Sequence, residues 1–110
     1  MFEESRNLIR RSANKRPPTH PGEMLIEEFM RPYGLTQVAL AERIGVPFQR
    51  VNQIINRRRS ITPDSALRLS RLLGTTPELW LNLQQAWDLY EARQPNVLKA
   101  INQIRPLQAS

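Results

Sequence analysis

The sequence of 110 residues contains no cysteine and only one histidine, His20. Without cysteine the chain can form neither a disulfide framework nor a thiolate metal site. A single histidine excludes the usual catalytic triads and histidine-clustered metal sites, and no phosphate-binding glycine loop is present. No segment approaches the ~20 apolar residues of a membrane span, and the N-terminus lacks the apolar stretch of a secretion signal. We therefore expect a cytoplasmic protein that is not an enzyme and that holds no metal or cofactor.

Acidic residues are missing from one part of this basic chain, whose formal net charge is +6. Residues 45–59 carry Arg50, Arg57, Arg58 and Arg59 but no aspartate or glutamate. A positive block of this density favours an anionic partner, with nucleic acid as the first candidate. The alternative is an ordinary solvated face, because positive charge is also favourable at a helix C-terminus. That local effect explains one arginine more easily than three.

The sustained alternation of polar and apolar residues that marks strands is absent too. Proline and glycine instead divide the chain into segments with apolar residues at helical spacing. These segments predict an all-α fold, a compact bundle of five helices with a short additional C-terminal helix, from the ranges 22–34, 36–45, 47–56, 62–74, 75–93 and 96–105. The faces expected to be apolar include Leu67 in the fourth segment and Ile104 in the last. We predict a basic tail over residues 1–19, a domain over 20–92, and a C-terminal helix and tail over 93–110 that can serve dimerisation.

The second and third predicted helices are separated only by Gly45 and Val46, so they must cross at a steep angle. Ala41 is small enough for the two backbones to approach closely, and Gly45 tolerates a positive φ at the turn. Apolar residues on both sides can face inward, namely Leu40, Ile44, Val46, Val51 and Ile54. Together these features predict a helix-turn-helix.

This segment resembles the Cro and phage-repressor (Xre-type) helix-turn-helix family, and the wider chain is similar to the HigA-type antitoxins of bacterial toxin–antitoxin modules. The most specific matching pieces are HPGE at 20–23, INRRR at 55–59 and TPELWLNL at 76–83. The resemblance implies a bacterial repressor that binds its operator DNA as a homodimer and neutralises a HigB-type ribonuclease toxin. Pro47 and Phe48 depart from the small or polar residues more common in the family. Arg57 replaces a common glycine, so Asn56 or Arg57 itself must turn the chain.

In a helix-turn-helix the second helix of the motif lies in the major groove, with its N-terminal turn toward the bases. The predicted base-reading residues are therefore Phe48, Gln49, Arg50 and Gln53. Arginine can pair with guanine and glutamine with adenine, whereas Phe48 can pack on thymine methyls or cover the edge of the core. Phosphate contacts are expected at a helix N-terminus and after the recognition helix, from Thr36, Gln37, Asn56, Arg57, Arg58 and Arg59.

Two surfaces are candidates for a basic toxin. Glu23, Glu27 and Glu28 form an acidic edge, for which an ordinary solvated face is the alternative. The N-terminal tail with Leu8 and Ile9 is the competing candidate, because an unfolded segment can wrap around a partner. His20, beside a helix start, is expected to act as a structural cap or to make a loop contact.

Large aromatic side chains gather on the fifth predicted helix. Part of this face must belong to the core, and the predicted dimer surface comprises Trp80, Trp87, Tyr90, Leu98 and Ile101. Three functions remain open: a repressor that is also an antitoxin, a toxin-binding module that does not read DNA, and a free-standing Xre-family regulator without a toxin partner. The arginine block beside polar groove-facing residues favours DNA binding over the second function.

Overall fold

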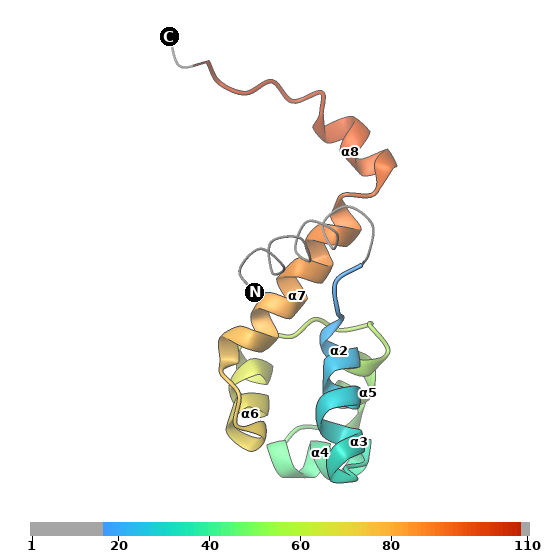
Figure 1. The fold of residues 1–110 in the computed structure, drawn as a ribbon, viewed down its shortest axis with the longest axis vertical. Coiled ribbons are helices and arrows are strands. Elements are labelled where there is room, and N and C mark those ends of the chain that lie inside the picture. Colours follow the sequence, from blue (N-terminus) through green and yellow to red (C-terminus); the bar gives the residue numbers. More distant parts are fainter. Residues whose placement is uncertain (1–16, 109–110) are drawn as a thin grey trace, which may run out of the picture.

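The computed structural model describes residues 17–108, and within this range the chain is all-helical, without strands (Figure 1). The first helix is continuous and consists of α2 (Pro21–Met24), the π-helical segment η1 (Leu25–Met30) and α3 (Arg31–Tyr33). It is followed by α4 (Gln37–Ile44), α5 (Phe48–Ile55), α6 (Pro63–Leu73), α7 (Pro77–Ala92) and α8 (Pro95–Ile101). The predicted all-α fold is confirmed. None of the helices in this range is long and apolar enough to cross a membrane.

Three helices begin at a threonine cap. The hydroxyls of Thr36, Thr62 and Thr76 each accept the backbone N–H of the residue three positions later, at 3.0 to 3.2 Å. Each cap satisfies a donor that has no partner inside the first turn of its helix. In α6 and α7 a proline and an acidic residue follow the cap, which suits the positive end of a helix. Short local signals therefore place the starts of α4, α6 and α7.

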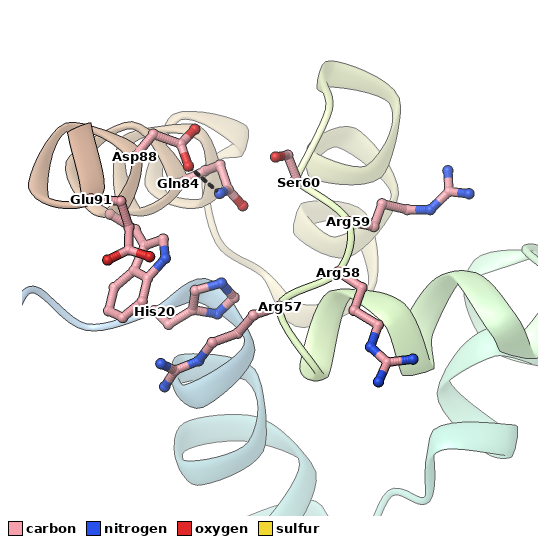
Figure 2. Close-up of a pocket in the computed structure, with 9 residues that line it drawn as sticks. His20, Arg57, Arg58, Arg59, Ser60, Gln84, Asp88 and Glu91 are labelled. Atoms are coloured by element: carbon pink, nitrogen blue, oxygen red, sulfur yellow. Dashed lines mark hydrogen bonds between the residues drawn. The ribbon is translucent and has the colours of Figure 1, made fainter. Parts of the chain in front are cut away.

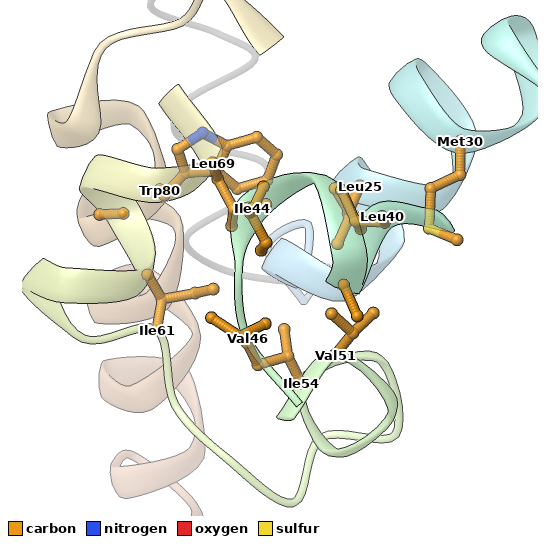
Figure 3. Packing of buried hydrophobic residues seen from close by; sticks show 12 residues of the cluster. Leu25, Met30, Leu40, Ile44, Val46, Val51, Ile54, Ile61, Leu69 and Trp80 are labelled. Atoms are coloured by element: carbon orange, nitrogen blue, oxygen red, sulfur yellow. The ribbon is translucent and has the colours of Figure 1, made fainter. Parts of the chain in front are cut away.

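The first helix, mainly through its η1 segment, shares one hydrophobic core with α4, α5, α6 and α7 (Figure 3). Its largest member is Trp80, whose side chain has no exposed surface. The Trp80 ring packs on Phe29 with centroids 5.7 Å apart, and its Nε1 donates to Thr75 Oγ1 at 2.7 Å. A fully buried side chain cannot touch a partner subunit, so the prediction that Trp80 lies on the dimer surface is wrong. Trp80 instead fixes α7 against the first helix.

Two other apolar residues lie outside the faces predicted for them. Leu67 is 59% exposed, because its side chain points roughly 100° away from the buried side chain of Ala66 on the same helix. Ile104 is 71% exposed and follows the end of α8 at Ile101. Figure 1 shows α8 beyond the C-terminal end of α7, away from the bundle. The compact part of the molecule is therefore built from α2 to α7.

Candidate nucleic-acid interface

Helices α4 and α5 meet in a tight turn that matches the predicted helix-turn-helix. Gly45 ends α4 with a left-handed φ of 74°, and the Val46 N–H donates to Ala41 O at 3.0 Å. The five inward-facing residues predicted for this motif are all buried. From α6, the Arg68 guanidinium donates to the carbonyls of Ile44 at 2.9 Å and Gly45 at 3.3 Å. Arg68 thus satisfies carbonyls that the end of a helix leaves without partners, and it ties the turn to α6.

The outward side of α5 carries four side chains that form a continuous row. Val51 and Ile54 are 2% and 3% exposed and anchor the opposite side of this helix in the core. At about 100° per residue, the side turned away from them carries Phe48, Gln49, Asn52 and Gln53. We call these four residues the outward row. Phe48 is 42% exposed and so lies at the surface.

Asn52 is a member of the outward row that the sequence prediction missed, although its spacing from Phe48 and Gln49 could have revealed it. Its Nδ2 donates to Gln37 Oε1 on α4 at 3.0 Å. On the same row, Gln53 Oε1 accepts from Arg59 Nε at 2.9 Å. Because arginine can only donate, this contact fixes the amide orientation of Gln53, with its NH₂ group turned away from Arg59. Residues outside α5 therefore orient two of its four outward side chains.

Arg50 lies at the flank of the outward row, and its guanidinium reaches α6. Its Nη1 is 2.9 Å from Asp64 Oδ2, and Arg68 Nε donates to the same oxygen at 3.0 Å. Hydrogen bonds from Arg68 and then Arg50 hold the pKa of the Asp64 carboxyl below its usual value. Asp64 therefore remains ionised at neutral pH, as the shared partner of two arginines. A base contact by Arg50 remains a prediction.

The three consecutive arginines after α5 point in different directions (Figure 2). Arg57 has a φ of 62°, so it turns the chain itself, as one of the two predicted alternatives required. Its guanidinium lies over the Trp87 ring, 4.5 Å from the centroid, in a cation–π contact. In Figure 2, Arg57 extends toward His20, whereas Arg58 and Arg59 extend to the other side of the loop. The run therefore has one member packed on α7 and two beside α5.

His20 joins the first helix to α7 and to the loop after α5. Its Nδ1 accepts the Gly22 N–H at 2.9 Å, which confirms the predicted structural cap. The ring is 2% exposed and stands edge-on to Trp87, with centroids 5.0 Å apart. Burial, and secondarily the positive charge of Arg57, lowers the pKa of His20. The imidazole is therefore neutral in the folded protein at neutral pH.

A polar pocket of about 240 Å³ lies between His20, the Arg57–Ser60 loop and α7 (Figure 2). On its α7 side, Gln84 is buried and bridges two segments, because its Oε1 accepts the Ile61 N–H and its Nε2 donates to Asp88 Oδ1, both at 2.9 Å. The pocket is lined by both arginines and carboxylates. The two hydrogen bonds of Gln84 brace the loop that follows α5.

The other predicted residues lie on separate surfaces. Glu23, Glu27 and Glu28 are exposed on the first helix, and Glu27 forms an ion pair with Arg31 at 2.6 Å. Leu8 and Ile9 lie outside the described residues. Trp87, Tyr90 and Leu98 are half-buried, and Ile101 is 47% exposed.

Comparison with known proteins places this geometry in a family. A family model described as helix-turn-helix matches residues 26–80. "Virulence-associated protein I" of Dichelobacter nodosus is 46% identical over 86% of this chain and 85% of its own length. "Antitoxin HigA-1" of Vibrio cholerae is 47% identical over 72% of this chain and 74% of its own length. The solved structure of "antitoxin GraA in complex with its operator" has a TM-score of 0.75 at 47% identity, covering 84% of this chain and 93% of that one. The chain belongs to the Xre-type helix-turn-helix family and, within it, to the HigA-type antitoxins.

Proposed function

We propose that this protein binds operator DNA as a homodimer, represses its own operon and neutralises a HigB-type ribonuclease toxin. The observation that carries the proposal is the outward row of α5, flanked on the chain by Arg58 and Arg59. Two relatives support the proposal: one is named antitoxin HigA-1, and the other, antitoxin GraA, has been solved in complex with its operator. The row supplies the side chains for a major groove, and the arginines supply charge for the phosphates.

In the proposed complex the outward row enters the major groove. Gln49 and Gln53 are the amide readers, Asn52 joins them, and Phe48 provides an apolar contact for thymine methyls. Arg50 contributes from the flank of the row. Gln53 is held for this task by Arg59, whose proposed role thereby includes orientation of a base reader as well as contact with phosphate.

The proposed phosphate contacts come from both ends of the motif. Thr36 caps α4, so the N–H groups of its first turn and the side chain of Gln37 can face the DNA backbone. Asn56, Arg58 and Arg59 follow α5 and are exposed. Arg57 packs on Trp87, so a phosphate contact from this residue competes with its cation–π contact.

The proposed dimer surface comprises Trp87 and Tyr90 on α7 with Leu98 and Ile101 on α8. Aromatic and aliphatic side chains of this kind are typical of the cores of subunit interfaces. A two-fold dimer would present two copies of α5 to half-sites about one DNA turn apart. Analytical ultracentrifugation of the protein and of Ile101→Asp tests it. We expect a dimer at micromolar concentration for the unchanged chain and a shift toward monomer for the variant, and a monomer in both would refute the interface.

DNA binding is tested by in vitro selection of duplexes, followed by affinity measurements at several salt concentrations. Arg50→Ala should change the preferred sequence. Arg58→Ala should weaken binding to all sequences about equally and flatten the salt dependence by about one unit, because one phosphate contact is lost. An unchanged base preference in Arg50→Ala would exclude a reading role for that residue.

Toxin neutralisation is tested by co-expression with the small protein encoded next to this gene, followed by a pull-down. We expect a stable complex and loss of the partner's ribonuclease activity. Charge reversal of the exposed edge, as Glu23→Lys with Glu28→Lys, should weaken the complex if that edge is the contact. Sequence-specific DNA binding with no captured partner would instead establish a free-standing regulator.

A further inference from the structure

Asp64 is a single carboxylate that restrains two arginines beside the recognition helix. One of its oxygens, Oδ2, lies 2.9 Å from Arg50 Nη1 and 3.0 Å from Arg68 Nε. It occupies the first turn of α6, where the helix dipole favours negative charge. The Asp64 side chain is 57% exposed, compared with 30% for that of Arg50. The carboxylate is thus the more exposed partner of the pair, and it holds Arg50 at the flank of the outward row.

The two arginines depend on Asp64 to different degrees. Arg68 has a second anchorage, because its Nη1 also donates to the carbonyls of Ile44 and Gly45. For Arg50, the contact with Asp64 is the hydrogen bond that its side chain makes within the described part of the chain. Removal of the Asp64 charge therefore releases Arg50 and leaves Arg68 attached to the turn.

An arginine released at this position would bind DNA without regard to sequence. Phosphates are present at every base step, and a charge-assisted contact between arginine and phosphate needs no particular base. An arginine held by Asp64 can contact only those DNA groups that lie close to it, and such close approach requires a duplex that fits the outward row. Restraint thus lowers the affinity for arbitrary DNA more than the affinity for the preferred sequence, and specificity is the difference between the two.

We propose that Asp64 is a specificity-determining residue, which holds Arg50 at the flank of the recognition helix and so withholds it from the phosphates of arbitrary DNA. The proposal rests on the proposed function, because it needs sequence-specific DNA binding. It assigns to the start of α6 a part in recognition, although that helix lies outside the helix-turn-helix motif itself.

The test compares Asp64→Asn with the unchanged protein on two duplexes. One is the duplex selected in vitro by the unchanged protein, and the other has the same base composition in shuffled order. We expect Asp64→Asn to bind the shuffled duplex about fivefold more tightly at ~0.15 M salt, with a salt dependence steeper by about 0.9, as for one added phosphate contact. The affinity for the selected duplex should change by less than about twofold, so that the ratio between the duplexes falls.

A matched control exists at the start of α7. Thr76, Pro77 and Glu78 repeat the Thr-Pro-acid pattern of Thr62, Pro63 and Asp64, and Glu78 is exposed and lies in no ion pair recorded among the described residues. Glu78→Gln removes the same charge from the same helical position without releasing an arginine. We therefore expect no fall in the ratio for Glu78→Gln.

A double variant distinguishes release of Arg50 from the simpler effect of losing the repulsion between the Asp64 carboxylate and the DNA phosphates. In Asp64→Asn with Arg50→Ala, the fivefold gain on the shuffled duplex should disappear, whereas a gain caused by lost repulsion alone would persist. Circular dichroism and thermal unfolding of all four proteins confirm that they are folded. The inference is overturned by an unchanged ratio in Asp64→Asn, by an equal gain in Glu78→Gln, or by a gain that survives in the double variant. If the unchanged protein selects no preferred duplex, the proposed function itself fails, which is a distinct result.

Discussion

Replacement of Gly22 by alanine should push the first helix away from the end of the recognition helix. A Cβ at this position would lie 3.0 Å from Ile54 O, 3.0 Å from Ile55 Cα and 3.1 Å from Ile55 O. All three atoms belong to the backbone of α5, so no side chain can rotate aside to make room. The two backbones must separate by a few tenths of an ångström.

The expected magnitude follows from two opposing effects. Overfilling a well-packed contact typically costs about 1–3 kcal/mol. Alanine has a higher helix propensity than glycine, by about 1 kcal/mol in a helix interior, and Gly22 lies in the first turn, where this gain is smaller. The steric cost therefore exceeds the gain, and we expect the free energy of unfolding to fall by about 1–2 kcal/mol. The melting temperature should drop by roughly 4–8 °C per kcal/mol in a domain of this size.

The measurement is thermal and urea unfolding combined with affinity for the selected duplex. Gly34→Ala is the matched control, because Gly34 has a φ of 63° and no atom within 4 Å of an added Cβ. It should lose about 1 kcal/mol from backbone strain and keep its DNA affinity. Gly22→Ala should lose both stability and affinity, since the shift is transmitted to the end of α5 and to the loop with Arg58.

Equal or higher stability of Gly22→Ala would refute this reasoning, because propensity would then outweigh the contact. A loss of stability with unchanged DNA affinity would refute the second step, namely that the contact positions the recognition helix.

Three further predictions concern the loop after α5 and its supports. Because the pKa of His20 is lowered in the folded state, the unfolded chain binds the proton first as the pH falls. The contribution of His20 to stability should therefore be constant above its ordinary pKa of about 6.5 and should fall below it. Urea titrations at several pH values should show this fall in the unchanged protein and a reduced one in His20→Asn, which retains a capping acceptor. Gln84→Leu leaves the buried Ile61 N–H without its partner and should cost about 1–3 kcal/mol in the same assay, whereas no loss would mean that water replaces the bond. Arg57→Ala and Arg57→Gly both remove the contact with Trp87. The glycine variant should nevertheless be more stable than the alanine variant by about 1 kcal/mol, because glycine tolerates the φ of 62°. Equal stabilities of the two variants would show that the turn is not strained.

Features that depend on neighbours in sequence were accessible without the structure. The caps at Thr36, Thr62 and Thr76 are local hydrogen bonds over three residues, and Gly45 with its positive φ ends α4 at the predicted position. The inward residues of the helix-turn-helix followed from helical spacing. The need for Asn56 or Arg57 to turn the chain followed from the resemblance, because Arg57 stands where a glycine is common in the family.

Features that depend on segments far apart in sequence were not accessible. Trp80 was assigned to a dimer surface, because an amphipathic pattern does not reveal which part of a broad apolar face the other helices cover. Arg50 was treated only as a groove-facing side chain, since its partner Asp64 is 14 residues away on another helix. Asn52 was missed although its exposure follows from spacing, and its bond to Gln37 again joins two helices.

The sequence by itself determined the helices, the tight turn between α4 and α5 and the family, because these depend on local hydrogen bonds, backbone preferences and short motifs. Tertiary structure decided which charged and polar side chains are restrained and which surface remains for DNA. HPGE illustrates the division: its histidine cap is a local contact over two residues, but the requirement for Gly22 arises only where the backbone of α5 packs against it. Close packing between distant segments is a property of the folded chain, and no local pattern encodes it.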